Sequence, residues 1–408
     1  MIRKYIFKCC YLVLFAGLLL DSCKKKEPSI DNYFLNYTIP DLPPTADYTV
    51  GCLYYSYTTW NVNIKYVPTI GIYTTSTAGV VPPTIMQAHI ADALSAKIDY
   101  FVFSVRSPTL DHNNYLIDSN VVTSFLNAPN SSSLHFAVSY NMSTATLGIT
   151  NTGNADANGN VRGTPIEANA TKLLGFYNDF KRLAYWFTKA NYQKVNGKWL
   201  IIMNHAQDLN SNMDPNTPGS NEPLYAQLRK NLSVLGFDLY IIGEQDQWSV
   251  PNNYYYREQN CVDAMYESNM TDNRGVLDRN YLFATTCDQN FAYWKKELES
   301  WPAGGLTPGT KNLEFVPMIE SGFNYQIAAP TSASLSIPRT ADGAFYRTFT
   351  NIAKRNASAS RLILIDSFNA FPNDTQIEPV ASSGNTTIFP VYGTNLLDIT
   401  RTEFKVSQ

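Results

Sequence analysis

The chain has 408 residues, a formal net charge of −3, and only 16% charged residues. Nothing in this balance draws it to nucleic acid or to an anionic surface. Its polarity comes from Asn, Ser, Thr and Tyr. The 27 Tyr and 6 Trp side chains offer aromatic faces of the kind that pack on sugar rings, although most aromatic residues simply pack in a core.

Residues 1–23 are predicted to form a bacterial lipoprotein signal peptide. Arg3, Lys4 and Lys8 form a basic region, an apolar run follows over 11–20, and Cys23 ends the segment. The apolar run is too short to span a bilayer as a mature helix. The pattern resembles Bacteroidetes-type signals in which the cysteine is lipidated and becomes the first mature residue. An uncleaved anchor and an ordinary secretory peptide are the alternatives.

Residues 24–47 are predicted to be a tether, and residues 48–408 a single domain. The expected location is the cell envelope, at the outer membrane, facing the periplasm or the cell surface, with membrane contact through the lipid anchor only. In that compartment disulfides are possible. Cys52 is expected to be a buried thiol, which leaves Cys261 and Cys287 as the plausible disulfide among the cysteines of the domain.

Short apolar runs alternate with helical or loop-rich segments along the domain. The eight runs are 50–57, 98–105, 134–140, 199–204, 237–243, 262–266, 313–319 and 362–365. Helical patterns lie at 86–97, 168–191, 224–235, 290–300 and 342–353. Such alternation predicts parallel strands with helical crossovers, and eight strands predict an α/β fold of the closed (β/α)8 TIM-like barrel type. A doubly wound open sheet is the alternative.

The loop after the last predicted strand has the most specific pattern, reading Asn-Ala-Phe-Pro-Asn-Asp-Thr-Gln-Ile-Glu-Pro over 369–379. It resembles the Asn-Glu-aromatic-x-Glu-Gly-Thr-Gln-Ile-Glu-Pro loop of glycoside hydrolase families 99 and 71. Tyr54-Tyr55, the Tyr-Gln-Lys-Val-Asn-Gly-Lys segment at 192–198 and Ile-Pro-Arg at 337–339 resemble further family segments in the same order. The resemblance implies a (β/α)8 barrel that engages carbohydrate.

Two glutamates of that family loop are replaced, because Ala370 and Asn373 stand where family 99 has its pair of catalytic carboxylates. Neither side chain can transfer a proton. The resemblance therefore implies a glycan-binding protein that has lost family-99-type endo-mannosidase activity, and restoring Glu at both positions is expected to be the simplest route to that activity. The alternatives are an active, divergent glycoside hydrolase with other carboxylates, and a structural surface lipoprotein.

Barrel enzymes bind substrate at the carboxyl ends of their strands, so acidic residues that follow the predicted strands are candidate catalytic groups. These are Glu244, Glu267, Glu320, Asp374 and Glu378. Glu378 is the first choice because its Gln-Ile-Glu-Pro frame is intact, although in the family this residue supports the site more than it performs chemistry. Each could instead be a salt-bridge partner or a helix cap. A pair within about 5 to 10 Å across an open cleft would favour the hydrolase.

Nine residues at the same end of the barrel are candidate carbohydrate contacts: Tyr54, Tyr55, Trp60, Arg106, Asn141, His205, Trp248, Asn369 and Gln376. Only one of Tyr54 and Tyr55 can face the interior, since side chains alternate along a strand. If the barrel closes, strands one and eight are neighbours, which would bring that tyrosine together with Asn369, Gln376 and Glu378. Neither a metal site nor a cofactor is predicted, because metal-ligand spacings and nucleotide-binding loops are missing from the sequence.

Overall fold

The computed structural model describes residues 38–406, except 60–63, 65, 143–164, 215–216, 246–256, 269–282, 325–326, 328–338 and 384–390. One compact unit spans Ile39–Gln408. Among the described residues, none of the helices is long and apolar enough to cross a membrane.

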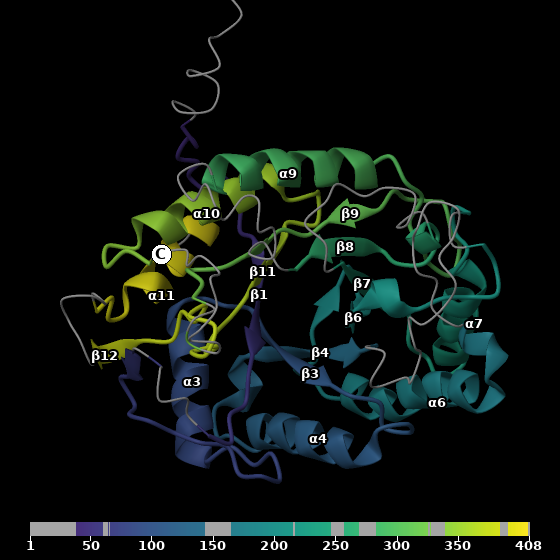
Figure 1. Ribbon diagram of the computed structural model, residues 1–408, viewed down its shortest axis with the longest axis horizontal. Coiled ribbons are helices and arrows are strands. Elements are labelled where there is room, and N and C mark those ends of the chain that lie inside the picture. Colours follow the sequence, from purple (N-terminus) through teal and green to yellow (C-terminus); the bar gives the residue numbers. More distant parts are fainter. Residues whose placement is uncertain are drawn as a thin grey trace, which may run out of the picture. The chain divides into compact units, whose positions relative to one another are not determined.

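Parallel strands surround a central axis in the order β10-β11-β1-β3-β4-β6-β7-β8-β9 (Figure 1). Their bounds are β1 Thr49–Tyr54, β3 Tyr100–Val105, β4 His135–Asn141, β6 Lys198–Asn204, β7 Leu239–Gln245, β8 Ala264–Glu267, β9 Glu314–Phe315, β10 Met318–Ile319 and β11 Leu362–Ile365. β9 and β10 are two halves of one strand, and they pair with β8 and β11 respectively. The sheet therefore returns to its starting point, and the predicted (β/α)8 barrel is confirmed.

The break in the seventh strand lies at Val316 and Pro317. A proline has no backbone N–H to donate, so regular pairing cannot run through this position. The backbone still bonds to both neighbouring strands, because the Val316 N–H donates to the Met265 carbonyl (2.9 Å) and the Pro317 carbonyl accepts from the Leu364 N–H (2.9 Å). The strand thus joins β8 to β11 despite the proline.

Helices lie outside the ring of strands (Figure 1). They are α3 Pro83–Ser95, α4 His112–Leu126, α6 Ala170–Phe187, α7 Glu222–Ser233, α9 Phe283–Leu298, α10 Ala344–Asn356 and α11 Asn395–Phe404. The five predicted helices correspond to α3, α6, α7, α9 and α10, with ends shifted by up to seven residues at α9, which begins at Phe283. α6 begins at Ala170 because the Asn169 side chain caps it by accepting from the Lys172 N–H.

Short elements complete the fold. β2 Tyr66–Pro68 pairs antiparallel with β12 Val380–Ser383, and β5 Lys194–Val195 pairs antiparallel with β6. Three-residue 3-10 turns lie at η1 Ser131–Ser133, η2 Ile166–Ala168 and η3 Ala206–Asp208.

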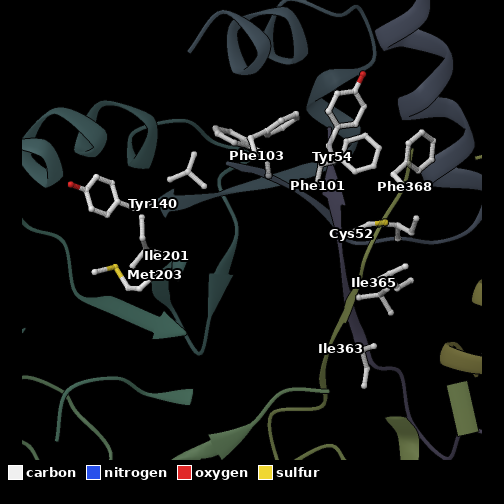
Figure 2. Close-up of a cluster of buried hydrophobic side chains, with 14 of the residues drawn as sticks. Cys52, Tyr54, Phe101, Phe103, Tyr140, Ile201, Met203, Ile363, Ile365 and Phe368 are labelled. Atoms are coloured by element: carbon white, nitrogen blue, oxygen red, sulfur yellow. The ribbon is translucent and has the colours of Figure 1, made fainter. Parts of the chain in front are cut away.

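Two separate apolar clusters follow from the alternation of side chains along the strands. The inner cluster fills the barrel and includes Val102, Ile202, Ile242, Met318 and Leu364. The outer cluster lies between the strands and the helices, and Figure 2 shows part of it, with side chains such as Cys52, Tyr54, Phe101 and Phe368. This division fixes which strand residues face the interior.

One glycine is needed for the inner packing. A Cβ atom at Gly51 would lie 2.3 Å from the Tyr100 ring, which is closer than any side chain tolerates. The buried Tyr100 ring therefore occupies the space that a side chain at position 51 would take.

The predicted disulfide is wrong. Cys261 and Cys287 are both free, buried thiols, and so is Cys52, as expected. Cys261 precedes β8 and its Sγ donates to the Arg257 carbonyl (3.2 Å), whereas Cys287 lies on α9. Burial raises the pKa of all three thiols well above the ordinary value, which keeps them protonated.

The last residues of the predicted tether contact the barrel. Asn351 of α10 donates to the Asp41 carboxylate (3.0 Å) and accepts from the Leu42 N–H (2.9 Å), and Arg361 donates to the Ala46 carbonyl (2.8 Å). These bonds place the segment from Asp41 to Ala46 within the compact unit.

Candidate functional site

The barrel interior changes from apolar to polar at the carboxyl ends of its strands. A residue two positions beyond the last apolar interior residue also faces inward, because side chains alternate. We define the mouth ring as the six residues found in this way: Tyr55, Ser104, Asn204, Glu244, Glu320 and Asp366. They follow or end β1, β3, β6, β7, β10 and β11, so they come from most of the circumference.

Glu244 is held by hydrogen-bond donors from two neighbouring strands and the turn after one of them. Its Oε2 accepts from the Asn204 amide nitrogen and from the backbone N–H of His205 (2.7 Å). The Tyr266 hydroxyl also hydrogen-bonds to Glu244. Donors that converge on a carboxylate stabilise its charged form and fix its orientation. These donors favour the charged form of the Glu244 carboxylate and orient it.

Asp366 faces the same interior from the end of β11. Burial raises the pKa of its carboxyl to about 6, the Tyr55 hydroxyl bond opposes this rise, and the charge of Glu244 adds to it. Its Oδ1 is buried without a partner among the described residues. A buried polar atom that lacks a partner costs free energy, so it is a place where a ligand hydroxyl gains by binding.

Glu320 lies beside Asp366. Ile319 and Ile365 are paired in register, so the next residue on each strand, Glu320 and Asp366, are neighbours on the inner face. Glu320 is only 7% exposed, and no hydrogen bond joins its side chain to any described residue. Burial, followed by the charge of Asp366, raises its pKa well above the ordinary value. Burial and the neighbouring Asp366 therefore both favour the protonated form of the Glu320 carboxyl.

Glu267 ends β8 but points the other way, since Tyr266 faces inward and side chains alternate. Its Oε2 accepts from Asn290 of α9 (3.2 Å), and it is fully buried. Burial, with a smaller effect of the Glu320 charge, raises its pKa well above the ordinary value. This placement puts Glu267 in the layer between β8 and α9 rather than in the mouth ring.

A cavity of 300 Å³ adjoins the mouth ring at the ends of β1, β3 and β4. Tyr55, Ser104, Arg106, Asp118 and Asn141 are among its lining residues. The Arg106 guanidinium makes a two-pronged contact with Asp118, with Nε–Oδ2 at 2.8 Å and Nη2–Oδ1 at 2.6 Å. This volume is at the lower end of the range of small-molecule sites, about 300–1,000 Å³.

Glu378 lies in a different place, inside a buried hydrogen-bond network. Its carboxylate accepts from the Tyr73 hydroxyl (2.6 Å) and contacts His89 Nε2 (3.2 Å), and His89 Nδ1 meets the Tyr54 hydroxyl (2.9 Å). The Asn369 side chain donates to the Tyr73 hydroxyl (3.2 Å) and bonds the Tyr55 backbone. Figure 2 shows Tyr54 in the outer cluster, so Tyr55 is the tyrosine that faces the interior.

Asp374 and Gln376 are likewise buried and bound to other parts of the loop. Arg339 contacts the Asp374 carboxylate (3.2 Å) and donates to the Gln376 carbonyl (2.6 Å), while the Gln376 amide donates to Asp374 (3.3 Å). The predicted pairing of the first and last strands is confirmed, since Thr49 pairs with Leu362. This pairing brings Asn369 to the Tyr55 backbone, as predicted. Gln376 and Glu378 are instead buried in the hydrogen-bond networks just described and do not line the mouth with Tyr55.

The remaining predicted positions divide into two groups. Ala370 is buried and Asn373 is exposed, and both lie in the loop after β11. Trp60, Trp248 and Cys23 lie outside the described residues.

Four residues at the mouth are not among the predicted site residues: Asp366, Ser104, Asn204 and Tyr266. Asp366 follows its strand directly, as Glu320 does, so the same rule would have found it. Counting in steps of two from the apolar residues of each strand would have found the other three.

The chain has a glycoside hydrolase-like (β/α)8 barrel fold. The chain is 26% identical to a solved structure described as a glycoside hydrolase-like protein, covering 92% of this chain and 99% of that one, with a TM-score of 0.74. The GH99 endo-alpha-mannosidase from Bacteroides thetaiotaomicron shares the fold at 14% identity, with 88% and 97% covered and a TM-score of 0.58. No protein-family model and no curated protein sequence matches the chain.

Proposed function

We propose that this protein binds a carbohydrate chain in the mouth of its barrel. The observation that carries the proposal is the mouth ring, in which hydroxyl, amide and carboxyl groups from six strand ends converge beside a 300 Å³ cavity. Hydroxyl-rich ligands need many hydrogen-bond partners of both kinds, and tyrosine rings such as Tyr55 add an apolar face. The likeness to a glycoside hydrolase-like protein and to an endo-alpha-mannosidase supports the same ligand class.

The proposal includes the loss of family-99-type catalysis. Ala370 and Asn373 occupy the two positions that the family loop assigns to catalytic glutamates, and neither transfers a proton. Ala370 is also 2% exposed, so a glutamate introduced there would need space and a partner that the buried site does not offer. Restoring the pair therefore faces a packing cost that the sequence did not reveal.

A second candidate function is glycoside hydrolysis with other carboxylates. The observation that favours it is a difference in hydrogen bonding. The Glu244 carboxylate accepts hydrogen bonds from several donors, whereas the Glu320 carboxyl accepts none from the described residues. Carboxyl groups with contrasting environments are a recurrent feature of acid–base catalysts.

Binding is tested by placing a large side chain in the mouth. Ser104→Trp is expected to fill much of the cavity beside Tyr55 and to weaken glycan binding at least about tenfold, which corresponds to about 1.4 kcal/mol. The measurement is affinity for a panel of α-mannans and host glycans. Ser132→Trp, the same change at the exposed η1 turn before β4, is the matched control. Absence of wild-type binding to every panel member would contradict the proposal, as would undiminished binding by Ser104→Trp.

We further propose a lipid anchor on Cys23 and a place in the cell envelope, on the basis of the basic and apolar segments that precede this cysteine. Cys23→Ala is expected to release the protein from membranes and to abolish incorporation of a labelled fatty acid. Incorporation at the wild-type level in the variant would exclude this site.

A further inference from the structure

We propose that Glu320 and Glu244 form the acid–base pair of a glycoside-cleaving reaction in the barrel mouth, with Asp366 as a positioning residue on the strand beside Glu320. The inference rests on the proposed carbohydrate function and goes beyond it, because it assigns a reaction and the roles of three residues.

The acid role of Glu320 follows from its isolation. Glu320 is 7% exposed as a residue, directly follows β10 at the barrel mouth, and makes no hydrogen bond to the part of the chain that the structure describes. A buried carboxyl without donors favours the neutral, protonated form, and the adjacent Asp366 favours it further. This environment favours the protonated carboxyl, which is the form that a general acid needs.

The base role of Glu244 follows from the opposite environment. Asn204, the His205 backbone and Tyr266 all donate to it, so the charged carboxylate is stabilised and oriented. Glu244 and Glu320 come from strands separated by β8, which places their backbones about 10 Å apart at a strand spacing of about 4.8 Å. Carboxyl groups that keep about the spacing of their backbones leave room for a water molecule, as inverting glycosidases require.

The reaction is a hydrolysis. Glu320 donates its proton to the glycosidic oxygen as the bond from this oxygen to the anomeric carbon breaks. A water molecule forms the new bond to the anomeric carbon and gives its proton to the Glu244 carboxylate. The products are two sugars with free hydroxyl groups, and exchange with solvent returns the proton from Glu244 to Glu320.

Asp366 acts through Glu320. Its negative charge on the neighbouring strand opposes the loss of the Glu320 proton. Glu267 on β8 and Cys287 on α9 also interact electrostatically with Glu320, and burial favours the neutral thiol of Cys287. The fall in rate at high pH should therefore reflect the pKa of the Glu320 carboxyl, and this pKa should depend on the charge of Asp366.

The experiment uses full-length protein and α-mannan oligosaccharides, with binding and product release measured on the same samples. Wild-type protein is expected to bind and to cleave through Glu320 and Glu244, without help from the loop positions 370 and 373. Glu320→Gln and Glu244→Gln are each expected to bind but to lower the rate by about 10²- to 10⁴-fold. Asp366→Asn is expected to move the alkaline limb to lower pH by about one unit. Glu258→Gln is the matched control, since it changes a buried carboxyl that binds Asn221 outside the mouth.

The outcomes separate the two proposals. Wild-type binding without cleavage would overturn the acid–base assignment and leave the binding function standing, whereas absence of binding would overturn both. Cleavage that survives Glu320→Gln or Glu244→Gln would also overturn the assignment. Thermal melts and retained binding establish that the variants fold. An unshifted pH profile in Asp366→Asn would remove Asp366 from the mechanism.

Discussion

Asp366→Asn is expected to make the folded protein more stable at pH 8 and to leave its stability at pH 4 nearly unchanged. The pKa of the Asp366 carboxyl is raised from 3.8 to about 6, mainly by burial. A raised pKa contributes stability below about pH 4 that is lost as the pH rises through about 6. The shift corresponds to roughly 2–3 kcal/mol of folding stability that the protein loses when Asp366 ionises. The Asp366→Asn variant avoids this loss because asparagine does not ionise.

The measurement is the free energy of unfolding by urea between pH 4 and pH 8. The groups that act on Asp366 are Tyr55 at β1, Glu244 at β7 and Glu320 at β10, and they are kept in the variant. Asp398→Asn, at a half-exposed position on α11, is the control. A stability difference that is the same at pH 4 and pH 8 would show that Asp366 ionises as freely in the folded protein as in the unfolded chain.

Glu378→Ala is expected to lower the free energy of unfolding by about 2–4 kcal/mol. Glu378, Tyr73 and His89 are all at most 6% exposed, and the carboxylate is the acceptor that joins them. Its removal leaves a buried hydroxyl and a buried imidazole without that partner, and each such group costs about 1–3 kcal/mol. Glu378→Gln keeps the shape and one acceptor oxygen, so its effect should be smaller. Chemical denaturation of both variants checks the order.

This prediction also separates two roles for Glu378. If the residue supports the loop after β11, folded Glu378→Ala protein should keep its glycan affinity. A variant with wild-type stability and lost binding would instead place Glu378 in contact with the ligand.

The strands could be predicted because each is a short apolar run, and the alternation with helices sets their parallel order. Two predicted strands end one or two residues too early. β7 reaches Gln245 and β8 reaches Glu267, because polar residues at a barrel mouth interrupt the apolar pattern that predicts a strand. α4 was not predicted, since only Val121, Val122 and Phe125 of its fifteen residues are buried and its apolar stripe is narrow.

The site could be predicted only in part. Chain position identified Glu244 and Glu320, but it could not show that Glu267 turns outward or that Glu378 and Asp374 have partners on α3 and at Arg339. Those outcomes depend on tertiary contacts between residues far apart in the sequence, such as the 289-residue separation of His89 and Glu378. The disulfide was mispredicted for the same reason, because cysteine count and compartment say nothing about where two thiols lie.

The central claim is that carbohydrate is bound in the mouth ring, and a crystal structure of the Glu320→Gln variant with an α-mannan oligosaccharide tests it most directly. We expect sugar hydroxyls within hydrogen-bond distance of Glu244 and Asp366, with a ring of the chain packed near Tyr55. An oligosaccharide bound elsewhere on the protein, with the mouth ring untouched, would contradict it.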